Sequence, residues 1–275
     1  MSSTEPRTLP RREPMFNAPA VVIALALLFV AIYAAFAWAP AAIQDLVIRD
    51  FAFAPGRLTV SFWPARAIDL LIRANTDLNA LEQARAMRQL HALTGGPKLW
   101  TLLTYAFLHG SWTHVLLNTI WLIAFGPPVA RRFGTVRFLT FMAVAAVVSA
   151  LAQWASAPME FAPLIGASGA VSGLMGAVTR FMFQPGAPLG PPSWREPMGI
   201  ETTPPASLRE VVVDSRTRIF LGIWLITNFV FGAFAQALGL SDMPVAWVAH
   251  LGGFAAGLFL FPLFDRRKAV ANSRL

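Results

Sequence analysis

Ser168 lies among glycines in an apolar stretch that reads IGASGAVSG over residues 165–173. A serine hydroxyl becomes a strong nucleophile only when a neighbouring base takes its proton, and a neutral imidazole is the usual base. The chain has four histidines, and His250 stands in a second apolar stretch, VAWVAHLGG. These residue types could perform acyl transfer, provided that the fold brings the hydroxyl of Ser168 to the imidazole of His250.

The composition indicates a membrane protein. Hydrophobic residues make up 56% of the chain and charged residues 13%, a balance that a soluble domain of this length rarely has. Because cysteine is absent, a disulfide framework and a thiolate zinc site are excluded. The net charge of +8 is spread over the segments between apolar runs, which favours a role in membrane topology over nucleic-acid binding.

Six apolar runs are candidate membrane-spanning helices, which need roughly 17 to 25 residues. The runs are 18–39, 108–125, 138–157, 168–183, 219–238 and 245–264. The first could be a signal peptide, but it is longer than a usual signal core, so we expect a retained helix. The fourth is the shortest, so we expect it to start below the membrane surface. The predicted fold class is an all-α integral membrane protein with a six-helix bundle.

Basic residues predict that both termini are cytoplasmic, because short cytoplasmic loops are enriched in Lys and Arg. Such residues precede the first run, separate the second from the third and the fourth from the fifth, and follow the sixth. The loops after the third and fifth runs contain none. The expected organisation is a cytoplasmic tail (1–17), a transmembrane domain (18–266) and a cytoplasmic tail (267–275), in a bacterial plasma membrane.

The long segment 40–99 is predicted to be an external loop. Leucines at mostly helical spacing beside Arg and Asp residues indicate helices that lie in the membrane interface, and a small external subdomain is the alternative.

The predicted topology gathers polar side chains near the outer face, where the second, fourth and sixth runs all begin. Ser168 starts the fourth run, and His250 lies about five residues into the sixth. His114 and Asn118 are four residues apart in the second run, so they share one face of a helix. Ionisable residues are costly within a membrane, and this layer is therefore the candidate functional site.

Glycines indicate which helices touch in this layer. Gly169, Gly173 and Gly176 mark one face of the fourth run, and Gly253 and Gly257 mark one face of the sixth. Small residues at such spacing let two membrane helices approach closely. We therefore expect the helix of Ser168 to pack against the helix of His250.

The chemistry that follows is a Ser-His dyad, since no acidic residue accompanies His250 within the runs. Backbone N–H groups at the start of the Ser168 helix suit a developing oxyanion, and His114 and Asn118 could add side-chain donors. A metal site is not expected, because His109 and His114 are five residues apart and have no acidic partner. Asn228 in the fifth run is interpreted as a hydrogen-bonding contact between helices, not as a catalytic group.

The sequence resembles the rhomboid intramembrane serine proteases over roughly residues 100–264. The matching pieces are HGSWTHVLLN (109–118), GASG (166–169) and AHLGGFAAG (249–257), in this order. The resemblance implies that Ser168 is the nucleophile and His250 the general base, that His114, Asn118 and the Ser168 N–H line the oxyanion hole, and that His109, Gly166 and Gly169 support the site. It also implies transmembrane protein substrates cut near their outer end, with no cofactor and no metal.

Two positions depart from better-known rhomboids. An aromatic residue that often stacks on the catalytic histidine would fall at Ser172, so other packing must hold His250. A Trp-Arg pair of the first loop appears as Trp100-Thr101, which removes the arginine that anchors that loop.

Three functions are consistent with the polar layer. The leading hypothesis is an intramembrane serine endopeptidase. The alternative is a non-proteolytic rhomboid-like protein that binds or escorts membrane proteins, although such relatives usually lack the serine or the histidine. A proton or solute pathway along His114 and His250 would leave Ser168 and the glycine faces unexplained.

Overall fold

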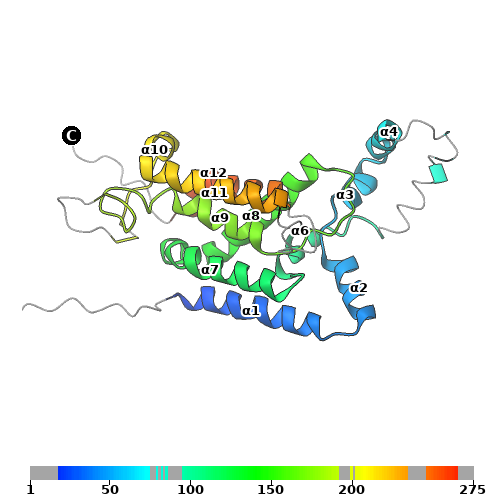
Figure 1. The fold of residues 1–275 in the computed structure, drawn as a ribbon, viewed down its shortest axis with the longest axis horizontal. Coiled ribbons are helices and arrows are strands. Elements are labelled where there is room, and N and C mark those ends of the chain that lie inside the picture. The colour runs from blue at the N-terminus through cyan, green and yellow to red at the C-terminus, as the bar shows by residue number, and fades with distance from the viewer. Residues whose placement is uncertain are drawn as a thin grey trace, which may run out of the picture.

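The computed structural model describes residues 18–74, 79, 82, 84–85, 95–191, 199–200, 202–234 and 246–265. Within them, all regular structure is helical apart from one isolated β-bridge. The bundle consists of α1 (Ala20–Ala37), α7 (Trp112–Phe133), α8 (Thr135–Ser156), α9 (Ser168–Val178), α11 (Ser215–Phe234) and α12 (Trp247–Phe264), which lie side by side (Figure 1). The shorter helices are α2 (Ala41–Phe51), α3 (Pro55–Phe62), α4 (Pro64–Ala74), α6 (Thr101–Thr104), the 3₁₀ turn η1 (Tyr105–Phe107) and α10 (Leu208–Val213).

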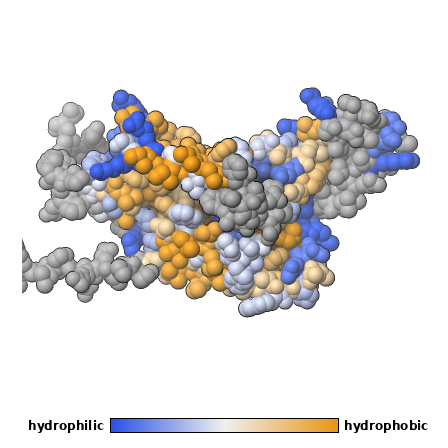
Figure 2. Space-filling view, in the orientation of Figure 1, coloured by the Kyte–Doolittle hydropathy of each residue, from blue (hydrophilic) through white to orange (hydrophobic). Residues whose placement is uncertain are grey.

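Four of these helices, α1, α7, α8 and α12, are long and apolar enough to cross a membrane. On the face that Figure 2 shows, apolar side chains cover much of the middle of the bundle, and the most hydrophilic ones lie toward its two ends. The prediction of an all-α integral membrane protein is therefore confirmed. In the places of the other two predicted spans, α9 is an apolar helix of 11 residues and α11 has 20 residues.

Helix α7 differs most from its predicted run, 108–125. It begins at Trp112, where the Ser111 side chain caps it by accepting a hydrogen bond from the His114 N–H at 3.1 Å. It continues through Pro127 and Pro128 to Phe133. Prolines are tolerated in membrane helices because neighbouring groups satisfy the freed carbonyls. Helices α1, α8 and α12 begin and end within about three residues of their predicted runs.

The close approach of α9 and α12 is confirmed, and it depends on glycine. A Cβ placed on Gly253 would overlap the carbonyl oxygen of Gly169, and one on Gly257 would overlap the carbonyl oxygen of Gly173. A Cβ on Gly173 itself would lie 2.7 Å from the Cβ of Ala145 in α8. Any larger residue would force these three helices apart.

Helices α7, α9 and α12 all begin at the same end of the bundle, which we call the Ser168 end. Helices α2, α3 and α4 gather there as well (Figure 1). Phe53 forms an antiparallel bridge with Leu164, in which the Leu164 N–H donates to the Phe53 carbonyl at 2.7 Å. The Gly56 N–H donates to the Glu160 carbonyl at 2.7 Å. The first loop is thus tied to the segment that leads into Ser168, whereas much of 75–94 lies outside the described residues.

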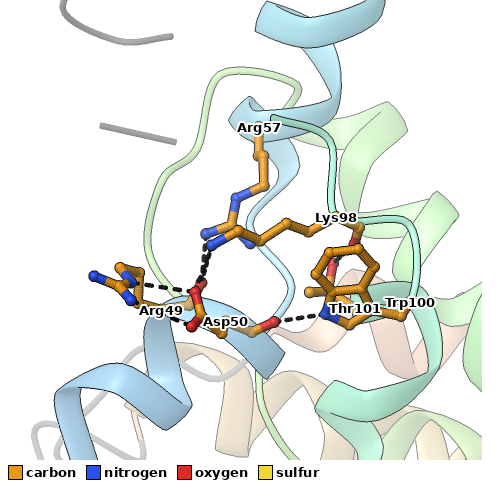
Figure 3. A network of polar contacts seen from close by, with 6 residues as sticks. All are labelled: Arg49, Asp50, Arg57, Lys98, Trp100 and Thr101. Carbon is orange, nitrogen blue, oxygen red and sulfur yellow. Dashed lines mark hydrogen bonds and ion pairs between the residues drawn. The ribbon is translucent and has the colours of Figure 1, made fainter. Parts of the chain in front are cut away.

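A polar network fixes the start of this loop against the segment before α6 (Figure 3). Lys98 Nζ lies 2.6 Å from a carboxylate oxygen of Asp50, and the Trp100 indole N–H donates to the Asp50 carbonyl at 2.7 Å. Arg57 donates to the Arg49 carbonyl at 2.9 Å. Arg57 and Lys98 therefore supply the cations that anchor this loop in a chain with threonine at position 101.

The opposite end, which we call the Arg132 end, is held by buried charge. Arg132 was expected in the loop between the second and third spans, but it lies in the last turn of α7 and its side chain is 1% exposed. It makes two hydrogen bonds to Asp265, at 2.7 and 3.1 Å, and donates to the carbonyls of Ile200 and Thr203. The residue therefore joins α7, the end of α12 and the segment before α10.

Candidate active site

Ser168 and His250 meet at the Ser168 end of the bundle. Ser168 is the first residue of α9 and His250 the fourth of α12, and both side chains are half-buried. The Ser168 hydroxyl oxygen lies 2.8 Å from Nε2 of His250. This distance is a hydrogen bond, and it lets the imidazole accept the hydroxyl proton directly.

The backbone around these two side chains is fixed by a serine and a glycine. Ser149 of α8 donates a hydrogen bond to the carbonyl of Ala249 at 2.7 Å, one residue before His250. A Cβ on Gly169, one residue after Ser168, would overlap the Ser149 hydroxyl. Helix α8 therefore supports both sides of the Ser168–His250 pair, and Gly169 leaves the room that this contact requires.

Gly166 brings the backbone in front of Ser168 close to His114. Gly166 has a φ of +115°, which favours glycine. A Cβ on this residue would lie 2.6 Å from Nε2 of His114 and 3.8 Å from the Ser168 hydroxyl oxygen. The His114 ring therefore lies against the turn at Gly166 that leads into Ser168. The Gly166 N–H donates to the Tyr105 carbonyl at 2.9 Å, which fixes this turn.

Asn118 is buried one turn below His114 on α7, and its amide donates to the His114 carbonyl at 3.0 Å. The described residues hold no hydrogen bond from Asn118 to Ser168 or His250. The bond to the His114 carbonyl uses one of the two hydrogens of the Asn118 amide.

His109 precedes α7 and lies behind His114. Its ring is 1% exposed and packs between Phe29 of α1 and His114, with ring centroids 5.6 and 5.1 Å apart. Neither ring nitrogen makes a hydrogen bond to the described part of the chain. His109 therefore contacts the wall of the site and not the Ser168 hydroxyl.

A polar group that sequence reasoning assigned to helix packing also reaches this site. Asn228 of α11 is buried, and its Oδ1 lies 2.7 Å from Nδ1 of His250. Its amide nitrogen donates to the Trp247 carbonyl at 3.3 Å. The interhelical contact was predicted, but its partner was not. The available signal was the rarity of a carboxamide within an otherwise apolar stretch, LITNFVF.

Comparison with known proteins identifies the family. Residues 96–267 match the family model of the Rhomboid domain, which is more than half of the chain. This chain belongs to the rhomboid family. The match begins just before α6 and ends just after α12. It therefore contains Ser168, His250 and the other candidate site residues, whereas Phe29 of α1, which contacts His109, lies outside it.

Curated relatives agree with this assignment. A putative rhomboid protease, YdcA of Bacillus subtilis (strain 168), is 34% identical over 77 residues, which are 28% of this chain and 38% of the relative. The rhomboid protease GlpG of Yersinia pestis (strain Pestoides F) is 29% identical over 173 residues, 63% of this chain and 50% of the relative. GlpG of Pectobacterium atrosepticum is 30% identical over 164 residues, 59% and 48% respectively. The chain thus spans half or less of the length of these relatives.

Proposed function

We propose that this rhomboid is an intramembrane serine endopeptidase that cuts transmembrane segments of membrane proteins. The observation that carries the proposal is the 2.8 Å contact between the Ser168 hydroxyl and Nε2 of His250 at the start of α9. The relatives named as rhomboid proteases support the same activity. A protein that only binds or escorts membrane helices has no need for this contact.

In the proposed reaction, the Ser168 oxygen attacks the carbonyl carbon of the scissile peptide while Nε2 of His250 takes the hydroxyl proton. The oxygen of that carbonyl becomes an oxyanion, which the Ser168 backbone N–H, the His114 ring and the Asn118 amide stabilise. His250 then gives its proton to the leaving nitrogen as the C–N bond breaks. Water then attacks the acyl carbon while His250 takes its proton, and His250 returns that proton to the Ser168 oxygen as the ester C–O bond breaks.

The same proposal includes the membrane topology. The domain runs from 18 to 266 with six spans and two cytoplasmic tails, 1–17 and 267–275, so that the Ser168 end faces outward. The distribution of Lys and Arg supports this orientation. The curated relatives are bacterial, which supports a bacterial plasma membrane. The partners are then the lipid bilayer and transmembrane substrates, without nucleic acid, cofactor or metal.

Cleavage of a single-span test substrate in liposomes examines the proposal. We expect wild-type protein to cut, and Ser168→Ala and His250→Ala to lose all measurable cutting. Ser172→Ala is the matched control, because Ser172 lies one turn further along α9 and is expected only to pack. A fluorophosphonate should label wild type and Ser172→Ala but not Ser168→Ala. Cutting by Ser168→Ala at the wild-type rate would overturn the mechanism.

A further inference from the structure

Asn228 touches the ring nitrogen of His250 that Ser168 does not use. Its Oδ1 lies 2.7 Å from Nδ1 of His250, while the Ser168 hydroxyl lies 2.8 Å from Nε2. The three side chains come from α11, α12 and α9 and form one continuous line of hydrogen bonds. The line is partly buried, so water competes little for these contacts.

The orientation of the Asn228 amide is fixed by a second partner. Its nitrogen lies 3.3 Å from the Trp247 carbonyl, a group that only accepts hydrogen bonds. The NH₂ group must therefore face Trp247, and Oδ1 faces His250. This division of roles matters because a reversed amide would present a donor to the imidazole.

An acceptor at Nδ1 determines the tautomer of the neutral imidazole. Oδ1 can only accept, so Nδ1 of His250 must carry the ring hydrogen. Nε2 then keeps its lone pair and faces the Ser168 hydroxyl, which is the arrangement that a general base needs. In papain-like proteases an asparagine takes the same third place beside a catalytic histidine.

The neighbouring turn holds Asn228 and His250 in register. Trp224 lies one turn before Asn228 on α11, and Phe254 lies one turn after His250 on α12. Their rings stack with centroids 4.2 Å apart and planes at 28°. Among the described residues no aromatic ring pairs with the His250 ring itself. The hydrogen bond that Nδ1 of His250 donates to Asn228 is thus the described side-chain contact that orients this imidazole on its Nδ1 side.

We propose that Asn228 is a positioning residue that holds His250 in the Nδ1–H tautomer and in the rotamer that reaches Ser168. The inference rests on the proposed function, since it concerns the efficiency of the same site. It replaces a dyad with a three-residue line in which the carboxamide acts through the histidine. Asn228 thereby holds the His250 ring in place, which the small side chain of Ser172 cannot do by stacking.

Two substitutions at this position separate a positioning role from helix packing. Asn228→Asp keeps an acceptor for Nδ1 but loses the donor to Trp247, whereas Asn228→Leu has nearly the same shape and loses both. We expect Asn228→Leu to lower kcat about 10- to 100-fold with KM within about twofold of wild type. Asn228→Asp should retain clearly more activity than Asn228→Leu. Thr227→Leu, at the adjacent exposed position of α11, is the control and should cut at the wild-type rate.

The outcomes are distinct. If Asn228→Asp and Asn228→Leu fall equally, the bond to Trp247 is what matters and the inference is wrong. Equal activity of Asn228→Leu and wild type also overturns it. Failure of wild type to cut at all, with Ser168 unlabelled by the fluorophosphonate, would instead overturn the proposed protease function.

The tautomer of His250 can also be measured in the wild-type protein, so this test does not depend on whether a variant at position 228 folds. Selective ¹⁵N labelling of the histidines, with the His250 signals assigned by their loss in His250→Ala, reports which ring nitrogen carries the hydrogen. We expect the hydrogen on Nδ1. A hydrogen on Nε2 of neutral His250 would overturn the inference whatever the cleavage assay shows.

Discussion

Helices α9 and α12 are joined by different means at the two ends of the bundle. From the Ser168 end to the middle of the bundle the contact is between backbones, where Gly253 and Gly257 meet the carbonyls of Gly169 and Gly173. At the Arg132 end, Arg180 just beyond α9 donates to the Leu258 carbonyl at 2.7 Å. The glycine contacts involve no charge and no rotatable side chain, whereas the contact with the Leu258 carbonyl depends on the long, charged side chain of Arg180.

The difference corresponds to what each end must do. A reaction between Ser168 and His250 requires a fixed separation, and glycine contacts set one without mobile groups. A guanidinium satisfies several carbonyls at once, and Arg180 also donates to the Ala206 carbonyl at 2.8 Å. The Arg132 end can therefore secure the segment before α10 through its carbonyl groups. We expect substitutions at the Arg132 end to lower mainly the stability, and substitutions at the glycine contacts to lower mainly the cutting rate.

Removal of the carboxylate at the Arg132 end should have the largest effect on stability. Asp265→Ala leaves the Arg132 guanidinium buried without its counter-charge, and such losses cost about 3 to 5 kcal/mol. We expect a clearly lower unfolding temperature in detergent, with the cutting rate per folded molecule unchanged. The double variant Arg132→Met, Asp265→Leu should be more stable than Asp265→Ala. An unfolding temperature of Asp265→Ala equal to wild type would show that the buried pair does not hold this end.

Adding a single methyl group tests the glycine contacts between α9 and α12. Gly257→Ala places a Cβ where the Gly173 carbonyl oxygen stands, so the helices must separate at a cost of about 1 to 3 kcal/mol. Cutting should fall more steeply than stability, because separation lengthens the Ser168–His250 contact. Gly222→Ala on α11 is the matched control, since nothing lies within 4 Å of its added Cβ. If the two variants behave alike in unfolding and cleavage assays, close packing is not what positions the site.

Ser149 allows a milder test at the same end. Ser149→Ala removes the hydrogen bond to the Ala249 carbonyl and should cost about 1 kcal/mol. Fluorophosphonate labelling of Ser168 should slow, because the backbone beside His250 loses a support. Ser156→Ala removes a hydroxyl that bonds only within its own helix and should change neither quantity. Labelling of Ser149→Ala at the wild-type rate would confine the role of Ser149 to packing.

Sequence alone could predict the features of the Ser168 end that depend on residue type and helical spacing. Ser168, His250 and the glycine faces are readable because few residues can take their places in an apolar helix. The start of α9 at Ser168 was predicted, and its contact with α12 followed from the spacing of the glycines. Local chemistry and helix periodicity carry this information together.

The other features depend on how helices rotate and which distant residues meet. Arg132 and Asp265 are 133 positions apart, and the charge pattern of Arg132 indicated only membrane orientation. Asn228 faces His250 because of the rotation of α11, which an almost uniformly apolar sequence does not reveal. The continuation of α7 through Pro127 and Pro128 was missed, since proline ends most soluble helices but is accommodated in a membrane.

Exposed charge at the Ser168 end gives the smallest expected effect and completes the comparison with the buried Arg132 pair. Hydrogen bonds from Arg49 and Lys98 lower the pKa of Asp50 from 3.8 to about 2. Because the folded state favours the carboxylate, its contribution is present above about pH 4 and is lost as the pH falls toward 2. The contribution is small, since solvent screens these groups.

The unfolding temperatures of wild type and Asp50→Asn, measured across this range, isolate that contribution because all other groups cancel in the difference. We expect wild type to be slightly more stable near neutral pH and the gap to close between about pH 4 and 2. A gap that stays constant with pH would mean that the loop is held by the bond from Trp100 to the Asp50 carbonyl, which the substitution leaves intact.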